Sequence, residues 1–147
     1  MTDVREPHWA VEIEAAPAEI WPVLTDFGAF PAWNPFITKA SGVVRTGERI
    51  RVTLRLGRWP VTLRPRLTAV DPPHELRWLA RQRVPGLFDV DRRFVLAPLG
   101  TARCRFAQSE SATGVLAPLL MWLLRRPILD GYRRLGAALK SRVEREG

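Results

Sequence analysis

The C-terminal stretch, residues 115–144, constrains the fold of this chain more than any other part of the sequence. Apolar residues recur there at spacings of three or four, which places them on one face of a helix. They are Leu116, Leu120, Leu124, Ile128, Tyr132, Leu135, Leu139 and Val143. Pro118 lies near the start, where proline is tolerated, whereas Pro127 lies in the interior and predicts a kink. Such an apolar stripe is not stable in water alone, so the preceding residues must form a surface that covers it.

Upstream of this helix the apolar period changes to two, which is typical of half-buried strands. We expect strands at residues 8–14, 36–44, 49–56, 61–70, 75–83, 87–97 and 102–111. Pro65 falls inside the fourth of these and indicates an edge position or a bulge. A helix at residues 18–25 and a second short helix before Pro35 separate the first two strands.

This order of elements predicts a single α+β domain over residues 1–147. The helical segments lie at two fixed places, and the strands follow one another as hairpins, which favours an antiparallel sheet over β-α-β winding. One face of the strands is rich in arginine, so the other face must close on an apolar partner. We expect a curved sheet of about seven strands that wraps around the C-terminal helix.

The charge and the cysteine content restrict the partners and the compartment. The net charge is +8, and the arginines alternate with apolar residues along the strands. That pattern fits a solvated outer face, and a binding site for a polyanion is the alternative. One cysteine allows no intramolecular disulfide. Residues 1–7 lack the apolar core of a signal peptide and no apolar run is long enough to span a bilayer, so we expect a cytoplasmic protein.

Residues that commonly bind metals or nucleotides are scarce in this sequence. His8 and His74 lie far apart and outside any metal-ligand spacing, and Cys104 stands alone. No glycine-rich phosphate loop is present. We therefore expect no metal site and no cofactor, and neither histidine lies beside a plausible nucleophile for a catalytic triad.

Several short motifs, in their order along the chain, carry a family resemblance. They are Ala16-Pro17-Ala18-Glu19-Ile20-Trp21, Asp26-Phe27, Phe30-Pro31-Ala32-Trp33-Asn34-Pro35, Glu75-Leu76-Arg77-Trp78, Gly86-Leu87-Phe88, Phe94-Val95-Leu96-Ala97-Pro98, Glu110 and Gly114. This succession resembles the START-like, or SRPBCC, superfamily, and especially its small bacterial members described as polyketide cyclase/dehydrase or lipid-transport-like proteins. The resemblance implies the helix-grip fold, also known from birch-pollen-allergen-like proteins, with an apolar cavity between sheet and helix. Relatives commonly have a histidine where this chain has Arg92.

The last two strands carry the polar residues of greatest interest. A hairpin turn at residues 98–101 would place Arg92 opposite Gln108, with Glu110 as its diagonal neighbour. If Phe94 faces inward, period two puts these three polar residues on the inward side as well. A buried arginine needs a partner, and Glu110 is the natural one. The pair is either a purely structural ion pair or a donor fork for a ligand carboxylate or enolate.

Two further residues are candidates for the same polar end. Tyr132 could contribute a hydroxyl, and Asp26 could contribute a carboxylate, although a role for Asp26 in ending the first helix is the alternative. The catalytic candidates are thus Arg92, Glu110, Tyr132 and Asp26.

The apolar candidates for a ligand cavity are large side chains on the sheet, the short helices and the C-terminal helix. They are Trp21, Phe30, Trp33, Phe36, Leu54, Trp78, Phe88, Phe94, Phe106, Tyr132, Leu116, Leu120 and Leu124. A plain hydrophobic core is the alternative for most of them. Trp122 has apolar neighbours on both helix faces, so it could border the cavity mouth, touch a membrane or form a dimer contact.

Three functions are compatible with this sequence. The first is binding or transport of a hydrophobic small molecule, such as a lipid, a polyketide or an aromatic compound, without catalysis. The second is a cyclase or aromatase that acts in the same cavity without metal or nucleotide. The third is an adaptor that contacts anionic membrane or nucleic acid through its arginine-rich outer face. We expect no specific nucleic-acid partner, possible peripheral contact with an anionic membrane, and a monomer or homodimer.

Overall fold

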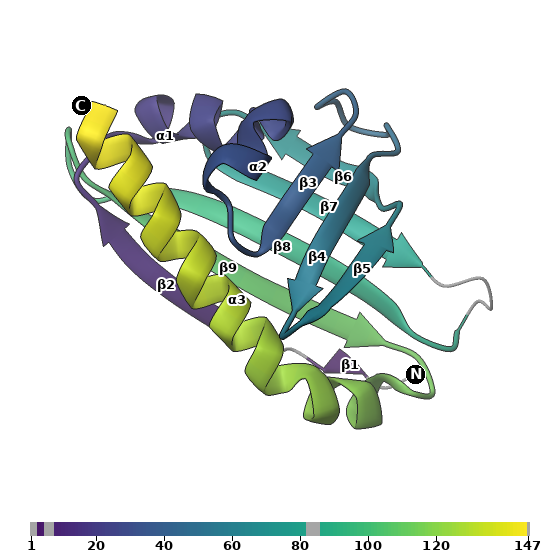
Figure 1. Cartoon of the computed structure of the whole chain (residues 1–147). Coiled ribbons are helices and arrows are strands. Elements are labelled where there is room, and N and C mark those ends of the chain that lie inside the picture. The colour runs from purple at the N-terminus through teal and green to yellow at the C-terminus, as the bar shows by residue number, and fades with distance from the viewer. Residues whose placement is uncertain (1–2, 5–7, 82–85, 147) are drawn as a thin grey trace.

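The computed structural model describes residues 3–4, 8–81 and 86–146, and Figure 1 shows its ribbon. Its strands are β1 (Asp3–Val4), β2 (His8–Ile13), β3 (Ile37–Ser41), β4 (Arg51–Leu56), β5 (Trp59–Leu63), β6 (Arg66–Asp71), β7 (Glu75–Arg81), β8 (Asp89–Pro98) and β9 (Cys104–Thr113). Its helices are α1 (Pro17–Thr25), the 3-10 turn η1 (Phe27–Ala29), α2 (Phe30–Trp33) and α3 (Ala117–Glu146). The predicted α+β class and order of elements are confirmed.

The strands form two antiparallel sheets. The larger has the order β1-β9-β8-β7-β6, with β2 also paired to β9, and the smaller has the order β3-β4-β5. Helix α3 packs along β2 and β9 on the inner side of the larger sheet (Figure 1). This is the helix-grip arrangement, in which a curved antiparallel surface encloses one long helix.

The expected single strand at residues 61–70 is divided at Pro65 into β5 and β6. Proline has no amide proton for the ladder, so pairing stops there. Its carbonyl oxygen still accepts a hydrogen bond from the Ile50 amide at 2.9 Å, and Arg49 forms an isolated bridge with Arg66. The expected sheet of about seven strands is therefore two sheets that meet at this break.

The other expected bounds differ from those of the structure by at most three residues. The strand expected at residues 75–83 is β7, which ends at Arg81, and residues 82–83 lie outside the described residues. The C-terminal helix begins at Ala117 instead of residue 115, and the Leu116 carbonyl oxygen accepts a hydrogen bond from the Leu120 amide at 2.9 Å. The Val115 and Leu116 amides, which have no acceptor within the helix, donate to the carbonyl oxygens of Gly86 and Leu87, at 3.0 and 2.9 Å.

Helix α3 continues through Pro127, as predicted, and its two halves pack differently. Its second half buries Ile128, Tyr132, Leu135 and Leu139 against the sheet. In Figure 1 the first turns of α3 are turned away from the axis of the rest, which fits the missing hydrogen bond at an interior proline. The first half is thus free to form a wall at one end of the molecule.

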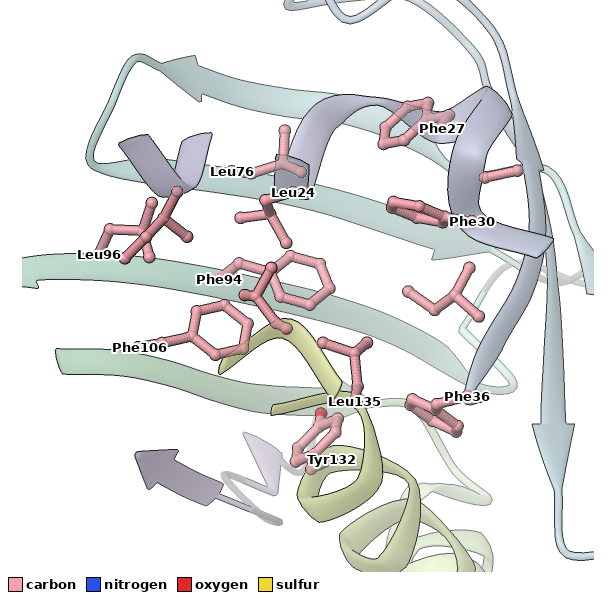
Figure 2. Close-up of a cluster of buried hydrophobic side chains, with 14 of the residues drawn as sticks. Leu24, Phe27, Phe30, Phe36, Leu76, Phe94, Leu96, Phe106, Tyr132 and Leu135 are labelled. Carbon is pink, nitrogen blue, oxygen red and sulfur yellow. The ribbon is translucent and has the colours of Figure 1, made fainter. Parts of the chain in front are cut away.

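The core between the sheet and α3 is aromatic. Phe94 and Phe106 are stacked with ring centroids 6.2 Å apart, and Trp78 meets Phe94 edge-on at 5.2 Å. Figure 2 shows Phe94 and Phe106 on the side of the sheet that faces Leu135 and Tyr132 of α3. Close packing of this kind fills the middle of the fold between the sheet and α3.

Candidate functional site

A pocket of about 420 Å³ lies between the β4–β5 hairpin, the inner face of β7 and β8, and the first half of α3. Its lining is formed by Leu54, Leu56, Val61, Leu63, Trp78, Ala80, Leu87, Phe88, Val90, Arg92, Glu110, Leu116, Leu120, Leu124 and Ile128. Thirteen of these fifteen side chains are apolar. The volume falls within the range of small-molecule sites, roughly 300–1,000 Å³.

The alternation of each strand produces this lining. Leu54 is paired with Val61 across the β4–β5 hairpin, and paired residues of antiparallel strands point to the same face. Leu56 and Leu63 extend the same face in both directions. Leu120 and Leu124 of α3, and Leu116 directly before it, are spaced by four residues and form a single stripe along the pocket.

Arg92 and Glu110 form the polar end of the pocket. They are direct cross-strand partners on β8 and β9 and are joined by a buried ion pair. Their side chains are only 3% and 2% exposed. A pair this deep is stable only because each charge compensates the other.

The predicted register of β8 and β9 was wrong by two residues. Glu110, not Gln108, lies opposite Arg92, and Gln108 lies opposite Phe94. The reason is the connecting loop, which spans residues 99–103 and is closed by a hydrogen bond from the Leu99 amide to the Arg103 carbonyl oxygen at 2.9 Å. Because the error is two residues, each side chain keeps its predicted face.

The Arg92 guanidinium is held from three sides. Besides Glu110, its central carbon lies 4.9 Å from the ring centroid of Phe36 and 5.2 Å from that of Tyr132, which are cation–π distances. Gln108 fixes the helix behind this cluster, since its Nε2 donates to the Tyr132 carbonyl oxygen at 2.8 Å. The guanidinium is therefore pre-organised.

Burial sets the protonation of this cluster. Desolvation works to lower the pKa of Arg92, but the Glu110 carboxylate outweighs it and the pKa is raised. Burial, reinforced by the same carboxylate, raises the pKa of Tyr132 well above its ordinary value. At neutral pH the cluster therefore presents a charged arginine and a neutral phenol.

Three buried polar atoms of the cluster have no hydrogen-bond partner among the described residues. They are Arg92 Nη1, Gln108 Oε1 and Tyr132 Oη. Of these residues only Arg92 lines the pocket. An unpaired buried donor is costly, so Arg92 Nη1 is a position at which a bound molecule could supply an acceptor.

The pocket brings together eight of the predicted site residues. These are Leu54, Trp78, Phe88, Arg92, Glu110, Leu116, Leu120 and Leu124. The remaining candidates do not line it. Phe36 and Tyr132 lie behind the guanidinium, and Phe30, Phe94, Phe106 and Gln108 are buried in the packed core.

The candidates from the short helices also lie elsewhere. Trp21 and Trp33 pack against the outside of the core. Asp26 is exposed at the junction of α1 and η1 and is not among the residues that line the pocket.

Sequence reasoning missed seven lining residues, namely Leu56, Val61, Leu63, Ala80, Leu87, Val90 and Ile128. A signal for most of them was present, because they continue the alternating or four-residue spacing of predicted ones, as Leu56 continues from Leu54. What the spacing does not reveal is where packing ends and open space begins.

Metal and membrane-spanning features were sought in the same structure. Within residues 3–4, 8–81 and 86–146, no group of three or more His, Cys, Asp or Glu side chains is arranged to hold a metal ion. Over the same ranges no helix combines the length and apolar character needed to cross a membrane.

The sequence matches one family model along almost its whole length. Residues 2–144 match the family described as polyketide cyclase/dehydrase and lipid transport. No curated protein sequence matches the chain.

Solved structures with the same fold come from proteins of different activities. A START superfamily protein from Mycobacterium smegmatis is 19% identical, with a TM-score of 0.73 and 99% of each chain covered. An aromatase/cyclase from a Streptomyces species is 14% identical, with a TM-score of 0.76 and 98% and 95% covered. Norcoclaurine synthase from Thalictrum flavum, in complex with dopamine and hydroxybenzaldehyde, is 17% identical, with a TM-score of 0.72 and 99% and 90% covered. At these identities the likeness concerns the fold.

Proposed function

The chain belongs to the polyketide cyclase/dehydrase and lipid transport family, and from this premise we propose that it binds an apolar small molecule in the pocket beside α3. Membership implies either hydrophobic ligand binding or cyclase activity. The observation that favours binding is the pocket itself, about 420 Å³ of apolar lining with a single polar end. An open apolar space of this size gains free energy when a ligand of matching shape displaces water.

The polar end suggests what the ligand carries. Arg92 already pairs with Glu110, so the two together are close to neutral. A ligand carboxylate would meet the Glu110 charge as well as the arginine, whereas a carbonyl or hydroxyl oxygen would accept from Arg92 Nη1 without repulsion. We therefore favour an apolar molecule with a neutral acceptor at one end, such as an aromatic ketone or a long-chain alcohol.

A cyclase that acts in the same pocket is the second candidate. It is favoured by the position of Arg92 and Glu110 against the pocket, because a guanidinium can stabilise an enolate that forms beside it. The neutral phenol of Tyr132 lies behind that guanidinium and would act as a positioning group. Asp26 does not line the pocket, so acid–base steps there would fall to Glu110.

The experiment is ligand capture followed by a matched pair of helix variants. The protein is incubated with a panel of polycyclic aromatic ketones, long-chain alcohols and fatty acids, and stoichiometric complexes are detected by native mass spectrometry. Leu120→Trp adds a large side chain to the pocket wall and should abolish capture. Leu119→Trp, on the adjacent exposed face of α3, should leave capture unchanged.

The panel also separates the two candidates. A bound compound that returns unchanged supports binding alone, and release of a cyclised product from a poly-ketone supports catalysis. If nothing in the panel binds, or if Leu120→Trp binds as well as the unmodified protein, the pocket is not the site and the proposal fails.

A further inference from the structure

Exposed apolar side chains lie on the two elements that form the pocket wall, the β4–β5 hairpin and the first half of α3. On α3 and just before it, Val115, Leu119, Trp122 and Leu123 are 82%, 54%, 75% and 54% exposed. Trp59, at the tip of the β4–β5 hairpin, is 70% exposed. We call these five residues the mouth surface. Large apolar groups this exposed are uncommon when clustered and mark a surface with a partner.

Trp59 belongs to the pocket side of its hairpin. Alternate residues of β5 point to the same face of the strand, so Trp59 lies on the same face as Val61 and Leu63. Val61 and Leu63 line the pocket. The cross-strand partner of Trp59 is Leu56, which also lines the pocket. This face therefore runs from inside the pocket to the outside, and Trp59 stands at its rim.

Helix α3 completes the rim from the other side. Leu116, Leu120 and Leu124 form the stripe that faces the pocket. Leu119 and Leu123 precede two of these by one position and fall on the neighbouring stripe, about 100° around the helix. The first half of α3 thus has two apolar faces, one toward the pocket and one toward solvent.

The segments that frame the mouth carry positive charge and no negative charge. Residues 49–70, which contain the hairpin, include six arginines and no Asp or Glu. Residues 112–129 include Arg125 and Arg126 and again no Asp or Glu. Arg58 at the hairpin tip, Arg125 and Arg126 are all exposed. The mouth surface is therefore an apolar ring bordered by arginines.

We propose that the mouth surface docks on an anionic lipid bilayer, with Trp59 and Trp122 in the interface and Arg58 and Arg126 at the level of the headgroups. Tryptophan favours the membrane–water interface, and arginine gains about 1 kcal/mol near an anionic leaflet. A second copy of the chain is a poorer partner, because a two-fold contact through this surface would bring the exposed Arg58 and Arg126 of both copies together.

Docking in this orientation would turn the open end of the pocket toward the lipid. An apolar ligand could then pass between the bilayer and the space beside Leu120 without crossing water. This use of the surface rests on the proposed ligand binding, but the docking itself does not, and it can be measured without any pocket ligand.

The test is co-sedimentation of the full chain with vesicles. One set contains phosphatidylcholine mixed with an equal part of phosphatidylglycerol, and the other contains phosphatidylcholine alone. We expect binding to the anionic vesicles only, with weakening as salt rises. Trp122→Ser with Leu123→Ser should reduce binding at least tenfold, and Arg58→Gln with Arg126→Gln should reduce it about twenty-five-fold, since each arginine contributes roughly fivefold.

A charge-matched control keeps the result specific to the mouth. Lys39→Gln with Arg105→Gln removes the same two charges from exposed positions on β3 and β9 and should bind as the unmodified protein does. Circular dichroism of every variant confirms that it is folded. Capture of a pocket ligand in solution by the Trp122 and Leu123 variant should be unchanged, so that failure to dock is distinguishable from failure to bind ligand.

Four results would overturn the proposal. They are absence of vesicle binding, equal binding to neutral vesicles, an equal loss of binding in the Lys39 and Arg105 control, and full binding by the mouth variants. Light scattering after gel filtration measures the oligomeric state. If the protein is a dimer and the Trp122 and Leu123 substitutions dissociate it, the surface binds a second copy of the chain and the membrane proposal fails.

Discussion

Arg92 is the residue on which the pocket's polar end depends. It is a charged side chain in an apolar environment, and Glu110, Phe36 and Tyr132 together compensate that cost. The cluster also leaves Nη1 without a partner. A residue of this kind is stabilised by its neighbours and is available to a ligand at the same time.

Removing the charge of Glu110 should destabilise the protein strongly. Glu110→Gln leaves the buried Arg92 charge uncompensated, and breaking a buried pair from one side costs about 3–5 kcal/mol in the free energy of unfolding. Urea denaturation, monitored by tryptophan fluorescence, measures this free energy of unfolding. The double variant Arg92→Met, Glu110→Leu removes both charges and should recover most of that loss. A Glu110→Gln protein as stable as the unmodified one would show that the pair is not buried in solution.

At the scale of elements, α3 lies unusually close to its neighbours at two glycines. A Cβ on Gly131 would overlap the Phe36 ring, and a Cβ on Gly136 would overlap the ring of Trp9. Glycine inside a helix is unfavourable by about 1 kcal/mol relative to alanine. Here it lets the helix backbone rest directly on aromatic rings, one of which also supports Arg92.

Gly131→Ala should therefore destabilise the protein in spite of its better helix propensity. Overpacking typically costs about 1–3 kcal/mol, which exceeds the propensity gain when the neighbour is a buried ring. Gly28→Ala is the matched control, because a Cβ there meets nothing within 4 Å, and it should change stability by less than about 0.5 kcal/mol. Urea denaturation of both variants decides the matter, and a stabilised Gly131→Ala would contradict the observed helix position.

At the scale of the whole molecule, the two sheets and α3 enclose groups whose ionisation is coupled to folding. The chain has one cysteine and one tyrosine, and both are fully buried. Burial raises the pKa of the Cys104 thiol from 9.0 to about 11. Burial also raises the pKa of Tyr132 above 10.0. Each group must lose its proton more easily in the unfolded chain than in the folded one.

Global stability should consequently fall in alkaline solution. Above the unfolded pKa the unfolded state binds fewer protons than the native state, so the free energy of unfolding decreases as pH rises. The decrease should begin near pH 9.0 because of Cys104 and steepen above 10.0 because of Tyr132. Urea denaturation across this range measures it. In Cys104→Ala the decrease should begin only near pH 10.0, the ordinary pKa of tyrosine. A free energy of unfolding that stays constant between pH 9.0 and 11 would contradict the burial of both groups.

The sequence determined the class of fold and the face on which each pocket residue points. Periods of two and of three to four are local properties, so the strands, the long helix and its buried stripe could be predicted from spacing alone. The inward side of Arg92 and Glu110 followed from the alternation of side chains along a strand, because a register error of two residues leaves each side chain on the same face. Pro65 indicated an edge or a bulge at the point where the structure divides the strand, because the missing amide proton is a property of the residue itself.

Only the tertiary structure decided which of the inward residues surround open space. Phe94, Phe106 and Tyr132 face inward as Leu54 and Leu120 do, yet the first three are packed and the last two line the pocket. The register of β8 and β9 depended in the same way on the loop at residues 99–103, whose length no spacing rule fixes. Periodicity states a direction for each side chain, whereas an open volume is what remains after all side chains from distant strands and α3 have been placed together.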